Sequence, residues 1–360
     1  MLPALSPRPD ASPDASALAL SMGDPAGIGL ELIAMCWLRR QSEAVPPFAV
    51  FGSVSELVAR AKLIGATVDV EAISDARMAA TVFQHAIPVI EIPLAHPATA
   101  GVASAANGGA VITAIERAVA AVHAGEAAAV VTNPIAKSVL YDAGFRHPGH
   151  TEFLADLARR HWPGAPADPV MMIASSALRV VPLTIHIALS EVPGAITHER
   201  IVDTARIMAS ALSTDFGLPR PRIAIAGLNP HAGEDGAMGM EEGRIIAPAI
   251  AELRTAGFDV TGPHPADTLF HAARRTTYDA VLAMYHDQAL IPAKTLAFDT
   301  GVNVTLGLPF VRTSPDHGTA FDIAGTGVAS PSSLIAALQL AKLMSERRSA
   351  ASTFPTPSRS

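Results

Sequence analysis

Three histidines, each placed just after an apolar run, are the residues of this 360-residue chain best suited to chemistry. His186 follows Ala-Leu-Arg-Val-Val-Pro-Leu, His231 follows Arg-Ile-Ala-Ile-Ala-Gly-Leu, and His286 follows Ala-Val-Leu-Ala-Met. Each run is typical of a buried strand, and side chains just past such strands point into the crevice where α/β proteins bind ligands. Three imidazoles delivered in this way could hold one divalent metal ion with coordination positions open for a substrate.

A structural role competes with this interpretation, because the chain contains 13 histidines and most of them lack this context. The metal site is favoured by recurrence, since strand, histidine and polar or glycine-rich loop follow one another three times. Asp287 comes directly after His286 and could orient its imidazole or act as a fourth ligand.

Other polar segments contain candidate anion-binding residues. Lys294 and Arg312 are isolated cations flanked by Gly, Thr and Ser, which is typical of phosphate or carboxylate sites, although exposed surface roles fit each equally well. Thr151 could cap a helix that has Glu152 in its first turn. His150 would then lie at the helix N-terminus, where the dipole favours a neutral, hydrogen-bonding imidazole.

The glycine-rich segment 21–31 joins a predicted strand to a predicted helix. Gly27 and Gly29 would allow an anion to approach the helix N-terminus, or they could simply permit a tight turn. The spacing of Gly23, Gly27 and Gly29 does not match the dinucleotide-binding fingerprint, and no Walker lysine follows.

Apolar runs and Ala-rich helical stretches alternate along the chain, which predicts an α/β fold whose parallel sheet is covered by helices on both faces. We expect a first lobe of residues 17–145 plus 300–348 and a second lobe of residues 146–299, with disordered tails at 1–16 and 349–360. Strands are expected at 17–22, 48–52, 127–132, 170–174, 180–184, 223–227 and 280–284, and helices from 29 onward, at 53–61, at 107–123 and at 332–345.

Composition excludes several classes of protein. A net charge of -7 argues against binding to the nucleic-acid backbone, which needs a basic face. The single cysteine, Cys36, excludes an internal disulfide and a cysteine-based metal site, and its apolar surroundings predict that it is buried. No apolar run has the length of a membrane span and the N-terminus lacks the features of a signal peptide, so we expect a cytoplasmic protein.

With these segments identified, the chain resembles the 4-hydroxythreonine-4-phosphate dehydrogenase family of vitamin B6 (pyridoxal phosphate) biosynthesis from about residue 17 to 342. The motifs that carry the resemblance are long and unusual. They are Met-Gly-Asp-Pro-Ala-Gly-Ile-Gly at 22–29, Gly-His-Thr-Glu-Phe-Leu-Ala at 149–155, Gly-Leu-Asn-Pro-His-Ala-Gly-Glu at 227–234, Pro-Ala-Asp-Thr-Leu-Phe at 265–270, Met-Tyr-His-Asp-Gln at 284–288 and Gly-Leu-Pro-Phe-Val-Arg-Thr-Ser-Pro-Asp-His-Gly-Thr-Ala at 307–320.

The resemblance implies a site and a fold. The fold is similar to that of the isocitrate and isopropylmalate dehydrogenases, with two α/β/α lobes, a cleft between them, and NAD(P) bound without the usual glycine motif, so no cofactor-binding residue is assigned. One divalent metal ion (Zn, Co or Mg) is shared by two subunits of a homodimer whose interface includes the second lobe. The implied metal ligands are His186, His231 and His286, and the implied substrate contacts are His150, Thr151, Lys294, Asn303 and Arg312.

The implied reaction is NAD- or NADP-linked oxidation of 4-phosphooxy-L-threonine to 2-amino-3-oxo-4-phosphooxybutanoate, which loses carbon dioxide to give 3-amino-2-oxopropyl phosphate. The metal would lower the pKa of the hydroxyl that is oxidised. Lys294 would act catalytically as a hydrogen-bond partner and proton carrier at that oxygen, and Arg312 would grip an anionic group. Dehydrogenases of threonate or erythronate 4-phosphate, or of aromatic-acid cis-dihydrodiols, remain the alternative. A phosphate acyltransferase or a pure binding module is disfavoured, because neither needs three metal-binding histidines.

Overall fold

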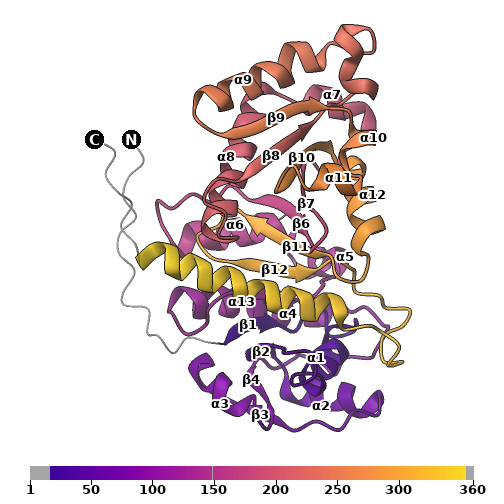
Figure 1. Ribbon diagram of the computed structural model, residues 1–360. Coiled ribbons are helices and arrows are strands. Elements are labelled where there is room, and N and C mark those ends of the chain that lie inside the picture. The colour runs from indigo at the N-terminus through magenta and orange to yellow at the C-terminus, as the bar shows by residue number, and fades with distance from the viewer. Residues whose placement is uncertain (1–16, 148, 354–360) are drawn as a thin grey trace. The chain divides into compact units, whose positions relative to one another are not determined.

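The computed structural model describes residues 17–147 and 149–353 (Figure 1). Contacts divide them into two compact units, one comprising the residues up to Pro169 with Leu308–Ser345 and the other Val170–Gly307 with the residues from Glu346 onward. Both units combine strands and helices, which confirms the predicted α/β class. No helix within the described ranges is long and apolar enough to cross a membrane.

The first unit contains a parallel sheet in the order β3-β4-β2-β1-β5-β12. The central strands β1 and β2 are buried along their whole length, as their continuous apolar sequences predict. The strands are β1 (Leu18–Ser21), β2 (Phe48–Gly52), β3 (Val70–Ala72), β4 (Ile87–Glu91), β5 (Val130–Thr132) and β12 (Arg312–Pro315). The helices are α1 (Gly29–Leu38), α2 (Val54–Leu63), α3 (Ala79–Val82), α4 (Gly108–His123), α5 (Lys137–Asp142) and α6 (His150–His161), together with the first part of α13 (Ser332–Thr353).

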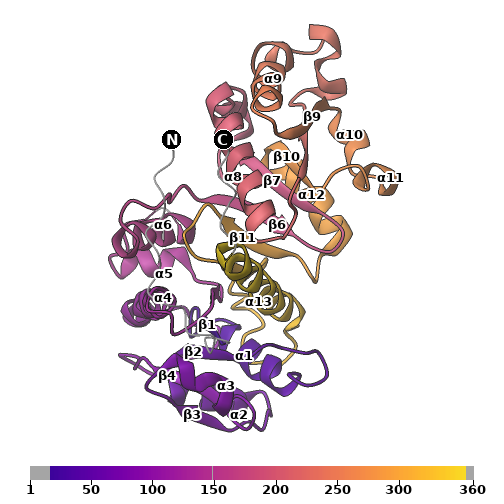
Figure 2. The same ribbon diagram turned by 60° about the vertical axis from the view of Figure 1, so that its left-hand side comes forward.

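The second unit contains strands in the order β11-β6-β7-β10-β8-β9. Figures 1 and 2 place α8 and α9, which pack against each other, on one side of these strands and α12 on the other. The strands are β6 (Val170–Ala174), β7 (Arg179–Thr184), β8 (Arg222–Ala226), β9 (Asp259–His264), β10 (Ala280–Tyr285) and β11 (Val302–Leu306). The helices are α7 (Val192–Ala195), α8 (His198–Thr214), α9 (Ala247–Thr255), α10 (Ala266–Leu269), α11 (Ala272–Arg275) and α12 (His286–Ala297).

The expectation of an entirely parallel sheet is wrong at β6, which pairs antiparallel with both β7 and β11. Only four residues, 175–178, join β6 to β7, and the Ser175 backbone N–H donates to Leu178 O at 2.9 Å. A connection this short can join only antiparallel neighbours, since a parallel crossover needs a dozen or more residues.

The units also differ in extent from the expected lobes. Residues 146–169 group with the first unit, because α6 packs against α4 there, and residues 300–307 group with the second, because β11 pairs with β6. Disorder from residue 349 is wrong for 349–353, which continue α13. The end of this helix is held where Arg348 Nε donates to buried Asp215 Oδ1 at 2.7 Å. The expectations for 1–16 and 354–360 lie outside the described residues.

The sequence prediction of helix starts is confirmed in the first unit. Ser53 caps α2 by accepting the Glu56 N–H, and α1 begins at Gly29. Cys36 is buried within α1, as expected. The glycine-rich turn before α1 is sterically constrained, because a Cβ on Gly29 would lie 2.5 Å from Met22 O and one on Gly27 would lie 2.9 Å from Thr319 O. This crowding supports the tight-turn interpretation of the segment.

We therefore expect Gly29→Ala to lower the free energy of unfolding by about 1–3 kcal/mol, because the added methyl group overlaps a backbone carbonyl. Gly109→Ala in α4 is the matched control: nothing lies within 4 Å of its added Cβ, so stability should be unchanged or rise by up to about 1 kcal/mol. Urea unfolding monitored by circular dichroism checks both variants. Equal stabilities of the two variants would contradict the prediction.

Candidate active site

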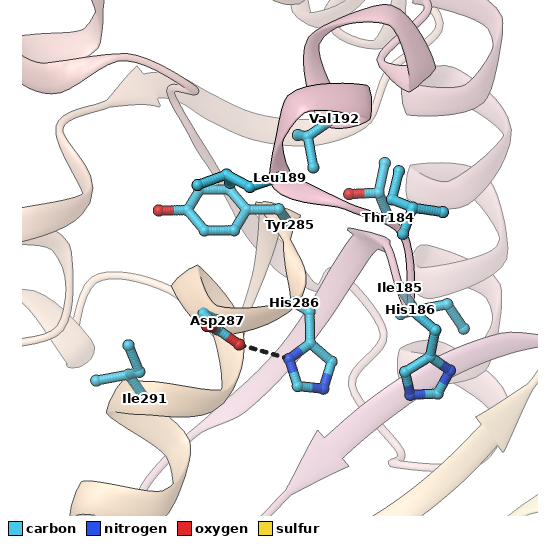
Figure 3. Close-up of a pocket in the computed structure, with 10 residues that line it drawn as sticks. Thr184, Ile185, His186, Leu189, Val192, Tyr285, His286, Asp287 and Ile291 are labelled. Atoms are coloured by element: carbon cyan, nitrogen blue, oxygen red, sulfur yellow. Dashed lines mark hydrogen bonds and ion pairs between the residues drawn. The ribbon is translucent and has the colours of Figure 1, made fainter.

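Adjacent parallel strands of the second unit bring two of the three predicted histidine ligands together. His186 lies two residues after β7 and His286 directly after β10, and these strands pair in register at Thr184 and Tyr285. The imidazole centroids of His186 and His286, which we call the histidine pair, are 5.6 Å apart (Figure 3). Buried Thr184 locks the two strand ends, because its Oγ1 donates to Met284 O at 2.9 Å.

His286 opens helix α12 and is not inside a loop, contrary to the sequence expectation. Its Nδ1 lies 2.7 Å from Asp287 Oδ1 (Figure 3). A carboxylate in this position holds the proton on Nδ1 and leaves Nε2 as the nitrogen that can bind a metal ion. Of the two roles that the sequence allowed for Asp287, the structure shows the contact needed for orienting the imidazole.

A pocket of about 420 Å³ adjoins the histidine pair. It is mostly apolar with a few polar groups, which is the usual composition of a small-molecule site. Leu189 and Ile291 on its rim are 69% and 66% exposed, which is unusual for such large apolar side chains. The lining residues are Thr184, Ile185, His186, Ile187, Leu189, Val192, Tyr285, His286, Asp287 and Ile291.

The third predicted ligand, His231, does not join this pair. It is exposed in a turn after β8, and no three His, Cys, Asp or Glu side chains among residues 17–147 and 149–353 are grouped to hold a metal ion. Its backbone is left-handed, with φ of 53°, and the next four residues are also left-handed. Such a conformation costs non-glycine L-residues roughly 1–2 kcal/mol each.

The other two predicted contacts of the second unit lie on regular elements, where the sequence indicated a polar loop. Lys294 is half-buried on α12, about two turns after His286, with its Nζ 5.9 Å from the centroid of the Phe298 ring. Asn303 is half-buried on β11, opposite Ile173 of β6.

In the first unit, Arg312 is a buried cation on β12, a strand that the apolar pattern of the sequence does not predict. It is 4% exposed, and its NH2 nitrogen donates to Thr132 Oγ1 of the neighbouring strand β5 at 2.6 Å. Burial lowers the pKa of Arg312 to about 10, so the guanidinium still carries its charge at neutral pH. A buried guanidinium of this kind is suited to hold an anionic group of a ligand.

His150 is the first residue of α6, as predicted, whereas Thr151 is not the cap, because Gly149 occupies that position. The His150 Nε2 is buried and has no hydrogen-bond partner within the described chain. Burial is the main cause that holds the His150 pKa well below its usual value, and the charges of Arg312 and Lys137 lower it further. The ring is therefore neutral at physiological pH, as the sequence predicted.

Lys137 belongs with this cationic group and was missed as a site residue. The signal was present in Thr-Asn-Pro-Ile-Ala-Lys, which directly follows a predicted strand. Its Nζ would lie 3.5 Å from a Cβ built on Gly149, at the N-terminus of α6. Lys137 and Arg312 thus place two cations around the neutral His150 within one unit, an arrangement that is suited to an anionic ligand.

The neutral state of His150 predicts a pH dependence of stability. The unfolded chain binds a proton at His150 near pH 6.5, whereas the folded chain binds it only at a lower pH. The contribution of the neutral His150 to the free energy of unfolding is therefore present above pH 6.5 and is lost as the pH falls. Between pH 7.5 and 5.5, the free energy of unfolding measured in urea should fall more steeply for the wild type than for His150→Gln. The two slopes should differ by at most about 1.4 kcal/mol per pH unit. Exposed His271→Gln is the control and should keep the wild-type slope; a wild-type slope in His150→Gln would refute the prediction.

Comparison with known proteins relates these features to a family. Residues 44–341 match the family model described as pyridoxal phosphate biosynthetic protein PdxA. A 4-hydroxythreonine-4-phosphate dehydrogenase of Bradyrhizobium diazoefficiens is 54% identical over 338 residues, which cover 92% of this chain and 97% of the relative. The crystal structure of such an enzyme from Klebsiella pneumoniae has a TM-score of 0.82 at 40% identity, covering 92% and 98% of the two chains. A terephthalate 1,2-cis-dihydrodiol dehydrogenase structure from Burkholderia xenovorans has a TM-score of 0.61 at 28% identity, covering 91% and 98%.

Proposed function

Because the chain belongs to the family of the pyridoxal phosphate biosynthetic protein PdxA, we propose that it oxidises 4-phosphooxy-L-threonine with NAD or NADP. The product, 2-amino-3-oxo-4-phosphooxybutanoate, then loses carbon dioxide to give 3-amino-2-oxopropyl phosphate. The observation that carries the proposal is the histidine pair, with the imidazole of His286 oriented by Asp287 beside a ligand-sized pocket. We place the enzyme in the cytoplasm, where nicotinamide cofactors are available.

The histidine pair fits a divalent cation, because two neighbouring imidazoles and an orienting carboxylate are the donors that Zn²⁺ or Co²⁺ prefers. A bound cation supplies Lewis acidity, which lowers the pKa of the hydroxyl to be oxidised. The third imidazole is assigned to His231 of the partner subunit in a homodimer. The separation of His231 from the histidine pair within one chain supports this assignment.

The substrate contacts are assigned to residues of both units. In the first unit, the cationic Arg312 and Lys137 and the neutral His150 suit an anionic group, with Thr151 beside them on α6. In the second unit, Lys294 and Asn303 are assigned to the polar groups of the substrate. Lys294, in its neutral form, would accept the proton of the hydroxyl that is oxidised and would then hydrogen-bond to the resulting ketone oxygen. A bound nicotinamide would supply the hydride acceptor.

The related cis-dihydrodiol dehydrogenases are the alternative, and one of their structures resembles this chain. The higher identity and TM-score to the 4-hydroxythreonine-4-phosphate dehydrogenase of Klebsiella pneumoniae favour the phosphorylated amino acid.

The test is formation of NADH or NADPH by metal-stripped protein with 4-phosphooxy-L-threonine, before and after addition of Zn²⁺, Co²⁺ or Mg²⁺. We expect turnover only after a metal is restored, and a higher kcat/KM than with threonate 4-phosphate or a terephthalate dihydrodiol. If the folded, dimeric protein has a higher kcat/KM with one of the other substrates, that compound is assigned as the substrate instead. Turnover that is unaffected by metal removal would reject the role of the histidines.

A further inference from the structure

The segment 229–239, which we call the His231 loop, is held in a conformation that its own residues disfavour. Six successive residues have positive φ, from His231 to Gly236, and only Gly233 and Gly236 among them lack a side chain. Local propensity would therefore let this loop relax toward ordinary conformations. Contacts with the rest of the second unit must therefore stabilise the conformation that holds His231 in place.

Glu242 supplies the most direct of these contacts. It is 5% exposed and begins the π-helical turn Glu242–Ile246 before α9. Its Oε1 accepts the backbone N–H groups of Leu228 at 2.8 Å and Asn229 at 2.7 Å, and its Oε2 accepts Asn229 Nδ2 at 2.9 Å. One buried carboxylate thus anchors the backbone where the His231 loop begins.

The same carboxylate also lies against the left-handed turn itself. A Cβ built on Gly233 would lie 2.7 Å from Glu242 Oε2, so only a glycine allows the turn to approach this closely. A second polar side chain links the anchored backbone to the histidine pair, because Gln288 Nε2 donates to Gly227 O at 2.8 Å from the first turn of the helix that starts at His286. Glu242 and Gln288 therefore both bind the backbone of residues 227–229, directly before the His231 loop turns left-handed.

We propose that Glu242 is a positioning residue for metal binding: its carboxylate holds the His231 loop in the left-handed turn that presents the imidazole of His231. This inference rests on the proposed function, in which His231 is a ligand. Removal of groups that orient a metal ligand typically lowers metal affinity by 10- to 100-fold, and an effect in this range is expected here.

The test measures Zn²⁺ affinity of the full-length protein by competition with a chromogenic chelator. Glu242→Gln preserves the size of the side chain and can keep the two backbone bonds at Oε1, but its amide places a donor where Asn229 Nδ2 needs an acceptor. Glu252→Gln makes the same chemical change at an exposed position of α9 and is the matched control. Glu242→Ala is the stronger variant, and His231→Ala tests the ligand itself.

We expect Glu242→Gln to weaken Zn²⁺ binding at least 10-fold, with Glu252→Gln unchanged, while metal-free Glu242→Gln keeps the wild-type circular dichroism spectrum. In activity assays, the half-saturating Zn²⁺ concentration should rise while kcat at saturating Zn²⁺ recovers, whereas a general folding defect would lower kcat at every concentration. If Glu242→Gln keeps the wild-type Zn²⁺ affinity while His231→Ala binds Zn²⁺ more weakly, the role of Glu242 is overturned and the assigned ligand stands. Wild-type affinity in His231→Ala overturns the assigned ligand set and this inference with it.

Discussion

His286→Ala is expected to abolish high-affinity Zn²⁺ binding and to lower kcat/KM for 4-phosphooxy-L-threonine by about 1,000-fold or more, which corresponds to about 4 kcal/mol. The variant removes one imidazole of the histidine pair and leaves Asp287 without the ring that it orients. The remaining imidazoles cannot hold a divalent cation with the same geometry, and the hydroxyl of the substrate then keeps its high pKa.

His271→Ala is the control for this experiment, because His271 is an exposed histidine of the same unit that lies outside the pocket. It should retain both Zn²⁺ affinity and activity. Chelator competition and steady-state kinetics measured on the same preparations separate loss of metal from loss of fold. Retained Zn²⁺ affinity in His286→Ala would show that the metal is bound elsewhere.

Arg312→Met is expected to lower kcat/KM for the phosphorylated substrate by about 100-fold, or about 3 kcal/mol, because a buried charge-assisted hydrogen bond to the substrate is lost. Methionine keeps much of the volume and is compatible with burial, so circular dichroism and thermal unfolding should show an intact first unit. Arg77→Met, at an exposed arginine of the same unit, should behave as wild type.

Measuring Arg312→Met with a second substrate identifies the anionic group that Arg312 binds. If Arg312 binds the phosphate, the loss should be much smaller with 4-hydroxy-L-threonine, which has no phosphate. If it binds the carboxylate, the two substrates should lose activity by the same factor. Unchanged kinetics with both substrates would remove Arg312 from the site.

Several elements of this protein are specified by local patterns in its sequence. Continuous apolar runs predicted β1, β2, β6, β7, β8 and β10, and the residues before α1 and α2 predicted where these helices begin. The neutral state of His150 also followed from its position at the start of a helix, and the structure adds burial and two neighbouring cations. These features depend on residues close in the chain, so they can be read without a three-dimensional structure.

Features that depend on distant residues were missed or misread. The strand of Arg312 looked like a polar loop, because its sequence Arg-Thr-Ser-Pro is buried only through pairing with β5, some 180 residues away in the chain. Asn303 was misread for the same reason, since β11 is defined by its antiparallel pairing with β6. The polarity of a segment therefore does not indicate whether it is buried when the strand that covers it is distant in the sequence.

Sequence alone thus determined the α/β class, the family resemblance and the identity of the candidate ligands, since each resides in local patterns and motifs. Tertiary structure decided which ligands meet within one chain: strand pairing joins His186 to His286, while the left-handed turn leaves His231 apart from them. It also revealed Glu242, whose carboxylate is 13 residues from Asn229 in the chain yet binds its backbone directly. Such contacts arise from how elements pack, and packing is a property of the whole fold that no single stretch of sequence encodes.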